Sequence, residues 1–178
     1  TPETKVIEPS SVYAIHKRDH EELFRVVGRA YGIPTVAFRY FNVYGTRQAL
    51  SNPYTGVFAI FVSRLLSKKA PMVFEDGKQR RDFVSVLDVA EANWMAANMP
   101  EADGEIFNVG SGVSVNVLDI ARTAADAVGF KVEAEVCGKY REGDIRHCFA
   151  DISKIKSKLG WAPKHALAND AIDLAAWV

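Results

Sequence analysis

Residues 35–41 read TVAFRYF, a nearly continuous run of β-branched and aromatic side chains. Such a run is typical of a strand that is buried on both faces of a parallel sheet. Before it, apolar residues recur at helical spacing, so a helix is predicted from about Ser11 to Tyr31, with Ser10 or Ser11 as its cap. Gly32-Ile33-Pro34 ends that helix, because proline cannot continue it. This helix and strand predict one layer of an α/β fold.

The rest of the chain continues the alternation of helices and strands. Residues 42–56 carry Gly, Asn, Ser and Pro at short intervals and predict a long loop, which in a compact domain is usually functional. Beyond it, periodicity predicts helices over 57–68, 88–99, 117–128, 152–159 and 166–178, and strands over 72–75, 81–85 and 106–109. The alternation favours a layered α/β architecture.

Composition narrows the functional classes. The chain has 178 residues, 48% hydrophobic and 25% charged, and a formal net charge of +0. A neutral chain lacks the basic footprint of a general nucleic-acid binder, so we expect no nucleic-acid partner. No apolar run is long enough for a membrane span, and the polar start is not a secretory signal. Cys137 and Cys148 have neither metal nor CxxC spacing, which fits a cytoplasmic protein.

The first candidate for chemistry is the pair Tyr13 and Lys17. Four residues apart on a helix, the phenol and the ammonium share one face. A free tyrosine titrates near pH ~10, and a neighbouring cation favours its phenolate form, so the pair could serve as a general base toward a hydroxyl group. A chain of this composition also produces such a pair by chance, so its context must decide.

That context is a series of short motifs in a fixed order. They are Tyr13-x-x-x-Lys17, YGIP at 31–34, RYFNVYG at 39–45, RDFV at 81–84, FNVGSG at 107–112, REGDIRH at 141–147 and ADISK at 150–154. With them the chain resembles the extended short-chain dehydrogenase/reductase family, specifically the NAD-dependent nucleotide-sugar epimerases and dehydratases. The resemblance implies the C-terminal part of a Rossmann-type parallel sheet plus a smaller α/β substrate-binding domain. It covers essentially the whole chain.

The resemblance also implies roles for particular residues. Tyr13 would take a proton from a sugar hydroxyl, and Lys17 would acidify it and contact the cofactor NAD. The other residues with implied roles are Tyr40, Phe41 and Val43 beside the nicotinamide, Asn42 and Phe74 on the substrate, Arg81 and Arg141 on its diphosphate, and Asp144 on the ribose. Four of them have a structural alternative: Arg81 could lie on a solvated strand edge, Arg141 in a surface ion pair, Phe74 in the core and Asn42 in a turn. His16 and His20 lack a third ligand, so we expect no metal.

One expected motif is missing. No G-x-G-x-x-G or G-x-x-G-x-x-G fingerprint follows a strand, and only 12 residues precede Tyr13, too few for the Ser or Thr that completes the catalytic trio in the family. We therefore expect residues 1–48 to be a remnant of the NAD-binding Rossmann domain, and residues 49–178 to be mainly the substrate-binding domain. The strand at 35–41 would lack neighbours on one side, and the Tyr13 helix would lose packing. An N-terminally truncated chain of this kind is expected to be inactive alone.

Three functions remain open. The leading one is NAD-dependent epimerisation at C4 of a UDP- or dTDP-hexose. A nucleotide-sugar 4,6-dehydratase or reductase is the second, and a non-catalytic binding or dimerisation module is the third. The resemblance implies a homodimer, with the Tyr13 helix as the kind of surface that packs across a two-fold axis.

Overall fold

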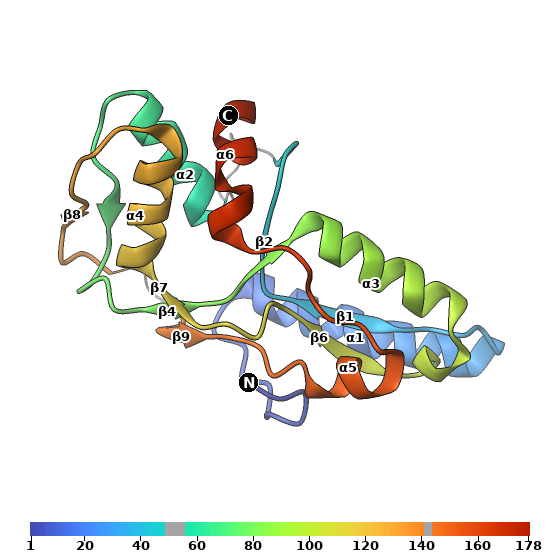
Figure 1. Ribbon diagram of the computed structural model, residues 1–178. Coiled ribbons are helices and arrows are strands. Elements are labelled where there is room, and N and C mark those ends of the chain that lie inside the picture. Colours follow the sequence, from blue (N-terminus) through green and yellow to red (C-terminus); the bar gives the residue numbers. More distant parts are fainter. Residues whose placement is uncertain (49–55, 141–143) are drawn as a thin grey trace.

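The computed structural model describes residues 1–48, 56–140 and 144–178, and Figure 1 shows their arrangement. The helices are α1 (Val12–Tyr31), α2 (Val57–Leu66), α3 (Val86–Asn98), the 3₁₀ turn η1 (Pro100–Ala102), α4 (Val117–Val128), α5 (Ser153–Leu159) and α6 (Leu167–Trp177). The strands are β1 (Ala37–Tyr40), β2 (Asn42–Tyr44), β3 (Met72–Val73), β4 (Arg80–Arg81), β5 (Phe83–Ser85), β6 (Ile106–Val109), β7 (Val115–Asn116), β8 (Glu135–Val136) and β9 (His147–Cys148).

The strand pairs are mainly parallel. β1 pairs with β6, β2 with β5, β3 with β8 and β4 with β9 in parallel, whereas β4 and β7 are antiparallel. Parallel pairing requires crossover connections, and helices supply several of them. The mixed α/β fold class predicted from the alternation is therefore confirmed.

Two hydrophobic clusters form the core. The first lies between α2, α4 and α6 and includes Phe58, Phe61 and Leu65, all at most 1% exposed. The second lies between β1, β6, α3 and α5, where Phe107 and Trp161 are buried. Figure 1 shows the first group of helices at one end of the molecule and the second around β1 and β6. The second cluster joins Phe38 on β1 to elements far along the chain.

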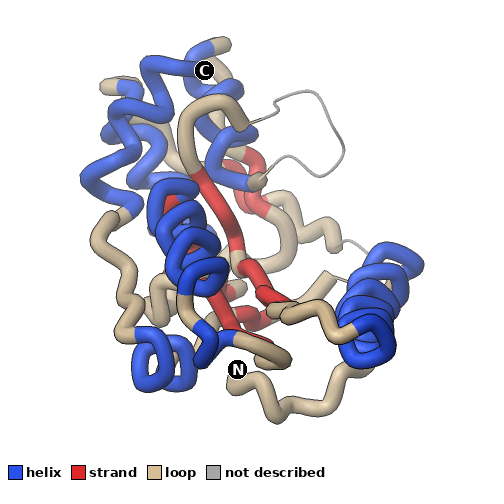
Figure 2. Tube along the Cα trace, turned by 90° about the vertical axis from the view of Figure 1, so that its right-hand side faces the viewer, coloured by secondary structure: helices blue, strands red, loops and turns tan. Residues whose placement is uncertain are grey.

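Helix α1 stands apart from both clusters. Of its 20 residues only Gly28 is buried, while Val12, Leu23 and Val26 are 71%, 58% and 66% exposed. In Figure 2, α1 lies to the side of the strands, separate from the other helices. Among the described residues β1 pairs with β6 alone. Within the described residues, β1 therefore has a strand partner on one edge, and α1 packs mainly through the region of Gly28.

Three predicted elements differ in the structure. Residues 42–44 form strand β2 rather than the start of a loop, because their backbone pairs with β5. The strand predicted over 81–85 is divided, because β4 pairs with β7 and β9 whereas β5 pairs with β2, and the buried Asp82 lies between them. The strand predicted over 72–75 ends at Val73, and Glu75 takes a positive φ of 51°. Residues 49–55 of the predicted loop lie outside the described part of the chain.

Neither a spanning helix nor a metal cluster is found in the described ranges. No helix there is long and apolar enough to cross a membrane. No three His, Cys, Asp or Glu side chains within residues 1–48, 56–140 and 144–178 gather as ligands would around a metal ion.

Candidate active site

Local sequence explains where Tyr13 and Lys17 lie. The Ser11 side chain accepts a hydrogen bond from the Ala14 backbone N–H at 3.1 Å and caps α1, so the helix begins immediately before Tyr13. At the other end Gly32 takes the left-handed conformation (φ 64°) that glycine adopts without strain. Lys17 Nζ lies 5.5 Å from the centroid of the Tyr13 ring. The two side chains are therefore brought together in the first turns of the helix, as their spacing predicts.

The strand that follows α1 changes neighbours at Phe41 and Asn42. The Phe41 N–H donates to the Val109 carbonyl at 3.1 Å, which extends the pairing with β6. The Asn42 N–H donates to the Asp82 carbonyl at 3.0 Å and begins the pairing with β5. Asn42 thus lies at the end of β1 where the chain crosses from one sheet to the next. Crevices at such strand ends are where open α/β sheets bind ligands.

The residues that were expected to border the nicotinamide, Tyr40, Phe41 and Val43, have different surroundings. The Tyr40 hydroxyl donates to Asn93 Oδ1 on α3 at 3.0 Å, and its ring stacks on Phe38. Val43 is half-buried and packs against the second hydrophobic cluster. Because alternate residues of a strand face opposite sides, Tyr40 lies on the face of β1 away from Arg39, which contacts α1. The roles of Tyr40, Phe41 and Val43 in cofactor binding stay predictions.

Arg81 and Asp144, 63 residues apart in sequence, form an ion pair. Arg81 Nη2 lies 3.2 Å from Asp144 Oδ1, and Arg81 Nη1 donates to the carbonyls of Arg80 and Arg146 at 3.0 and 2.9 Å. The Arg81 side chain is only 13% exposed, so its guanidinium is held in one orientation. The alternative of a solvated strand edge therefore fits poorly. Arg141 lies outside the described residues.

Asp82 organises the backbone around this ion pair. Its side chain is fully buried, and its two oxygens accept hydrogen bonds from Ser111 N and Oγ (both 2.6 Å), Gly112 N (3.0 Å) and Ala150 N (3.0 Å). The predicted turn at 110–112 is thus shaped around a carboxylate, which already takes its backbone donors. Sequence reasoning passed over Asp82, because nothing in RDFV shows which distant amides will surround the carboxylate.

Arg146 secures the segment that carries Asp144. Its guanidinium pairs with Glu75 at 2.6 Å and with Asp76 at 2.7 Å, and the hydrogen bond from Arg146 lowers the pKa of Asp76 below its ordinary value. Strand β9 continues the attachment by pairing with β4. The Phe74 ring is 43% exposed beside this turn, so it is not a core residue as its structural alternative proposed.

Other polar contacts hold the surroundings in place. The buried Tyr44 hydroxyl donates to Asp170 on α6 at 2.9 Å, and burial raises the pKa of Tyr44.

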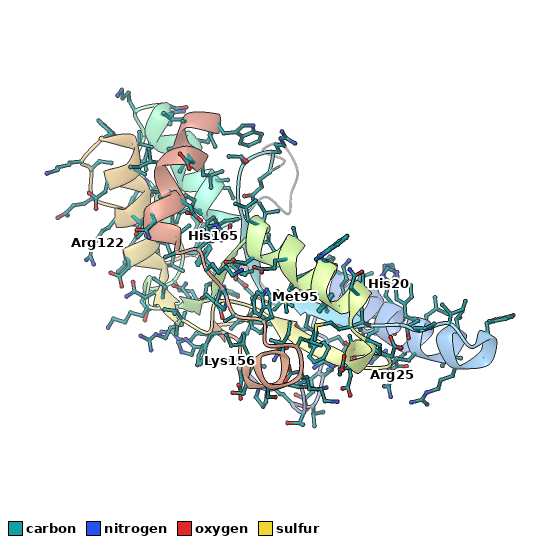
Figure 3. All side chains as sticks on the ribbon, turned by 45° about the vertical axis from the view of Figure 1, so that its right-hand side comes forward. His20, Arg25, Met95, Arg122, Lys156 and His165 are labelled. Atoms are coloured by element: carbon teal, nitrogen blue, oxygen red, sulfur yellow. The ribbon has the colours of Figure 1, made fainter. Side chains whose placement is uncertain are left out.

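Two concavities have volumes of about 490 and 410 Å³, one along α4 and residues 131–134, the other between α1 and residues 33–36. Neither is lined by a predicted site residue. Figure 3 shows Arg122, which lines the first concavity, on the outer side of α4.

Parallel strand pairs and the helices that connect them define an α/β protein, with Tyr13 and Lys17 together at the start of α1. The chain belongs to the NAD dependent epimerase/dehydratase family, whose pattern matches residues 1–110.

Named relatives agree with this assignment. The chain is 39% identical over 171 residues to the dTDP-L-rhamnose 4-epimerase of Burkholderia thailandensis, which covers 96% of this chain and 47% of the relative. It is 38% identical to a putative UDP-glucose 4-epimerase of Methanocaldococcus jannaschii, over 99% of this chain and 56% of the relative. The crystal structure of UDP-glucose 4-epimerase from Thermotoga maritima with UDP-glucose superposes with a TM-score of 0.92 at 36% identity, over 99% of this chain and 56% of that one. The chain thus spans about half the length of these relatives.

Proposed function

We propose that this chain forms the substrate-binding and Tyr/Lys catalytic part of an NAD-dependent nucleotide-sugar 4-epimerase. The observation that carries the proposal is the contact between Lys17 and the Tyr13 ring at the start of α1. The ion pair between Arg81 on β4 and Asp144 supports it, because a guanidinium held in place suits a diphosphate. The relatives named above act on, or bind, nucleotide sugars.

Tyr13 would act as the base and acid of the reaction. Its phenolate takes the proton of the sugar 4-hydroxyl, and the same oxygen returns that proton when the hydroxyl forms again with inverted configuration. The Lys17 ammonium beside the ring favours the phenolate by electrostatic attraction. A positioned proton acceptor of this kind accelerates a reaction by about 10²- to 10⁴-fold.

The residues of this chain fit one end of NAD. Tyr13 is 53% exposed, so a phenol and an ammonium are presented together where a nicotinamide ribose could meet them. When bound, NAD supplies the hydride acceptor and donor for C4. Phe41 and Val43 would border the nicotinamide, and we also assign this role to Tyr40. No glycine fingerprint for the pyrophosphate occurs in the sequence, so a further NAD-binding segment outside these 178 residues is part of the proposal.

The substrate would lie beside the sheet formed by β7, β4 and β9. Arg81 and Arg141 would pair with the diphosphate, Asp144 would accept from the ribose hydroxyls, and Phe74 would lie against the base. Asn42 would contact the sugar from the end of β1. The base, uracil or thymine, would distinguish a UDP-hexose from a dTDP-hexose.

The outer face of α1 supports a homodimer. Val12, Leu23 and Val26 are more than half exposed, and an apolar helical face of this size favours association with another surface. The division into residues 1–48 and 49–178, and a location in the cytoplasm, complete the proposal.

Assays of the full-length protein would test the activity. Incubation with UDP-glucose and dTDP-hexoses should yield the 4-epimer without release of reduced cofactor. A 4-keto-6-deoxy product would instead establish the dehydratase, and a reduced sugar the reductase. Binding of UDP without any turnover would favour the non-catalytic module.

A separate measurement tests whether the 178-residue chain binds NAD by itself. We expect the 178-residue chain alone to show no NAD binding by calorimetry and no turnover, because it lacks the fingerprint that binds the pyrophosphate. Robust NAD binding by this chain would contradict that expectation.

A further inference from the structure

A two-pronged ion pair joins α1 to β1. Arg39 Nε and Nη2 donate to the two carboxylate oxygens of Glu21, each at 2.8 Å. The side chains are 25% and 13% exposed, so water screens the pair only partly. Two parallel hydrogen bonds from one planar guanidinium fix orientation as well as distance. This geometry differs from that of a loose surface ion pair.

Two more contacts attach α1 and the segment before it to the chain around β1. Gly28 approaches Thr35 so closely that a Cβ on this glycine would lie 2.7 Å from the Thr35 side chain. The remaining Arg39 donor, Nη1, reaches the Glu3 carbonyl at 2.9 Å and ties down the segment before the helix. Much of the apolar surface of α1 is exposed, with Val12, Leu23 and Val26 more than half exposed, so hydrophobic packing against the described residues contributes little to positioning the helix.

These two contacts fix the register of α1 along β1. Gly28 meets Thr35 and Glu21 meets Arg39, so α1 runs antiparallel to β1. Lys17 lies one turn beyond Glu21, about 6 Å at 1.5 Å per residue, and Phe41 lies about 7 Å beyond Arg39 along an extended chain. Tyr13 lies about 12 Å beyond Glu21, level with Val43. By these rises per residue, the Tyr13–Lys17 pair is level with residues 41–43 along the direction of β1.

We propose that Glu21 and Arg39 are positioning residues that set the register of α1 against β1, and so place Tyr13 and Lys17 beside residues 41–43. The consequence for catalysis rests on the proposed function. A single residue of register along the helix moves the phenol by about 1.5 Å, and a misplacement near 1 Å can cost about 10²-fold in rate.

The test combines three variants with a matched control. Glu21→Gln removes the charge at nearly constant shape, Arg39→Lys keeps the charge but loses the two-pronged geometry, and the double variant Glu21→Arg/Arg39→Glu reverses the pair. Glu22→Gln is the control, since Glu22 is exposed on the same helix. Hydrogen exchange of the α1 amides, thermal stability, and separate kcat and KM values are measured on the full-length protein.

We expect Glu21→Gln to raise α1 exchange at least tenfold and to lower kcat about tenfold to a hundredfold, with KM for the sugar nucleotide nearly unchanged. Arg39→Lys should fall between Glu21→Gln and wild type, and the reversed pair should recover most of the loss. A pair with only a structural role would lower the melting temperature and leave the kcat of the folded fraction unchanged, which would overturn the proposal. Equal α1 exchange in Glu21→Gln and Glu22→Gln would also overturn it.

The two readouts separate this inference from the proposed function. If the wild-type protein has no epimerase activity but Glu21→Gln still loosens α1, the assigned reaction is wrong while the register function stands. If turnover is normal and the pair has no effect on α1, the register function is wrong while the reaction stands.

Discussion

The proposed chemistry depends on single side chains, and these differ sharply in their exposure to solvent. Tyr13 is half-exposed beside a lysine, whereas Asp82 is sealed among four hydrogen-bond donors. A substitution at the first should therefore affect turnover, and one at the second should affect stability.

Replacing Tyr13 with Phe should lower kcat of the full-length protein by about 10²- to 10⁴-fold, because the proton acceptor is lost while the ring is kept. KM for the sugar nucleotide should change little. Steady-state kinetics check this, with Tyr31→Phe as the control, since Tyr31 is 76% exposed on the same helix. Equal losses in the two variants, or unchanged turnover in Tyr13→Phe, would rule out Tyr13 as the base.

Replacing Asp82 with Asn should lower the free energy of unfolding by about 3 kcal/mol, because charge-assisted hydrogen bonds are lost in a fully buried site. The amide also brings a donor where four donors already converge. Urea denaturation measures the effect, with the exposed Asp126→Asn as the control. A loss below about 1 kcal/mol would show that water or a rearranged turn replaces the carboxylate.

At the scale of secondary-structure elements, polar contacts between residues far apart in sequence join elements that belong to different hydrophobic clusters. Asp88, in the first turn of α3, accepts from Lys164 N at 3.0 Å, from His165 N at 3.1 Å and from His165 Nδ1 at 2.8 Å. The segment before α6 is thus attached to the start of α3, and Figure 3 shows His165 at the base of α6.

This contact predicts a pH dependence of stability. The hydrogen bond to Asp88 raises the pKa of His165, so the folded state binds a proton more tightly than the unfolded chain. The resulting stabilisation is complete below the unfolded pKa near ~6.5 and is lost as the pH rises through the raised pKa of the folded state. In urea denaturation between pH 5 and 9, the free energy of unfolding of the wild type should fall relative to that of His165→Asn as the pH rises. The exposed His147→Asn should follow the wild type; a constant difference between wild type and His165→Asn would refute the linkage.

At the scale of the whole molecule, the outer face of α1 exposes several apolar side chains, among them Val12, Leu23 and Val26 at 71%, 58% and 66%. Its exposed apolar residues predict self-association of the isolated chain. Val26→Lys should weaken that association about tenfold, since covering a valine contributes about 1.5 kcal/mol and 1.4 kcal/mol is tenfold in a dissociation constant. Light scattering after size exclusion measures the mass, with Trp94→Lys on α3 as the control. A monomer at all concentrations, or the same effect from Trp94→Lys, would exclude α1 as the interface.

Much of the fold follows from local pattern. The helix at 117–128 and the strand at 106–109 were predicted with the boundaries that the structure shows, because each has a clear period and a capping or turn residue at its end. Strands β7, β8 and β9 were not predicted. Each has only two residues, too few to show a period, and forms because a partner strand is nearby.

In the candidate site, too, some contacts follow from local sequence and others only from the tertiary structure. The meeting of Tyr13 and Lys17 follows from helical spacing and a serine cap, which are properties of neighbouring residues along the chain. Other contacts join residues that lie 18 to 68 positions apart. These are the ion pair of Glu21 with Arg39, the hydrogen bond from Ala150 to the buried Asp82 carboxylate, and the ion pair of Asp144 with Arg81. Such pairings depend on which chain segments the folded core brings together, because a hydrogen bond needs contact within about 3 Å, and no one-dimensional period encodes that distance. Local helices and strands could therefore be predicted from the amino acids, whereas the contacts of α1 with β1 and those around Arg81, Asp82 and Asp144 depend on the packed molecule.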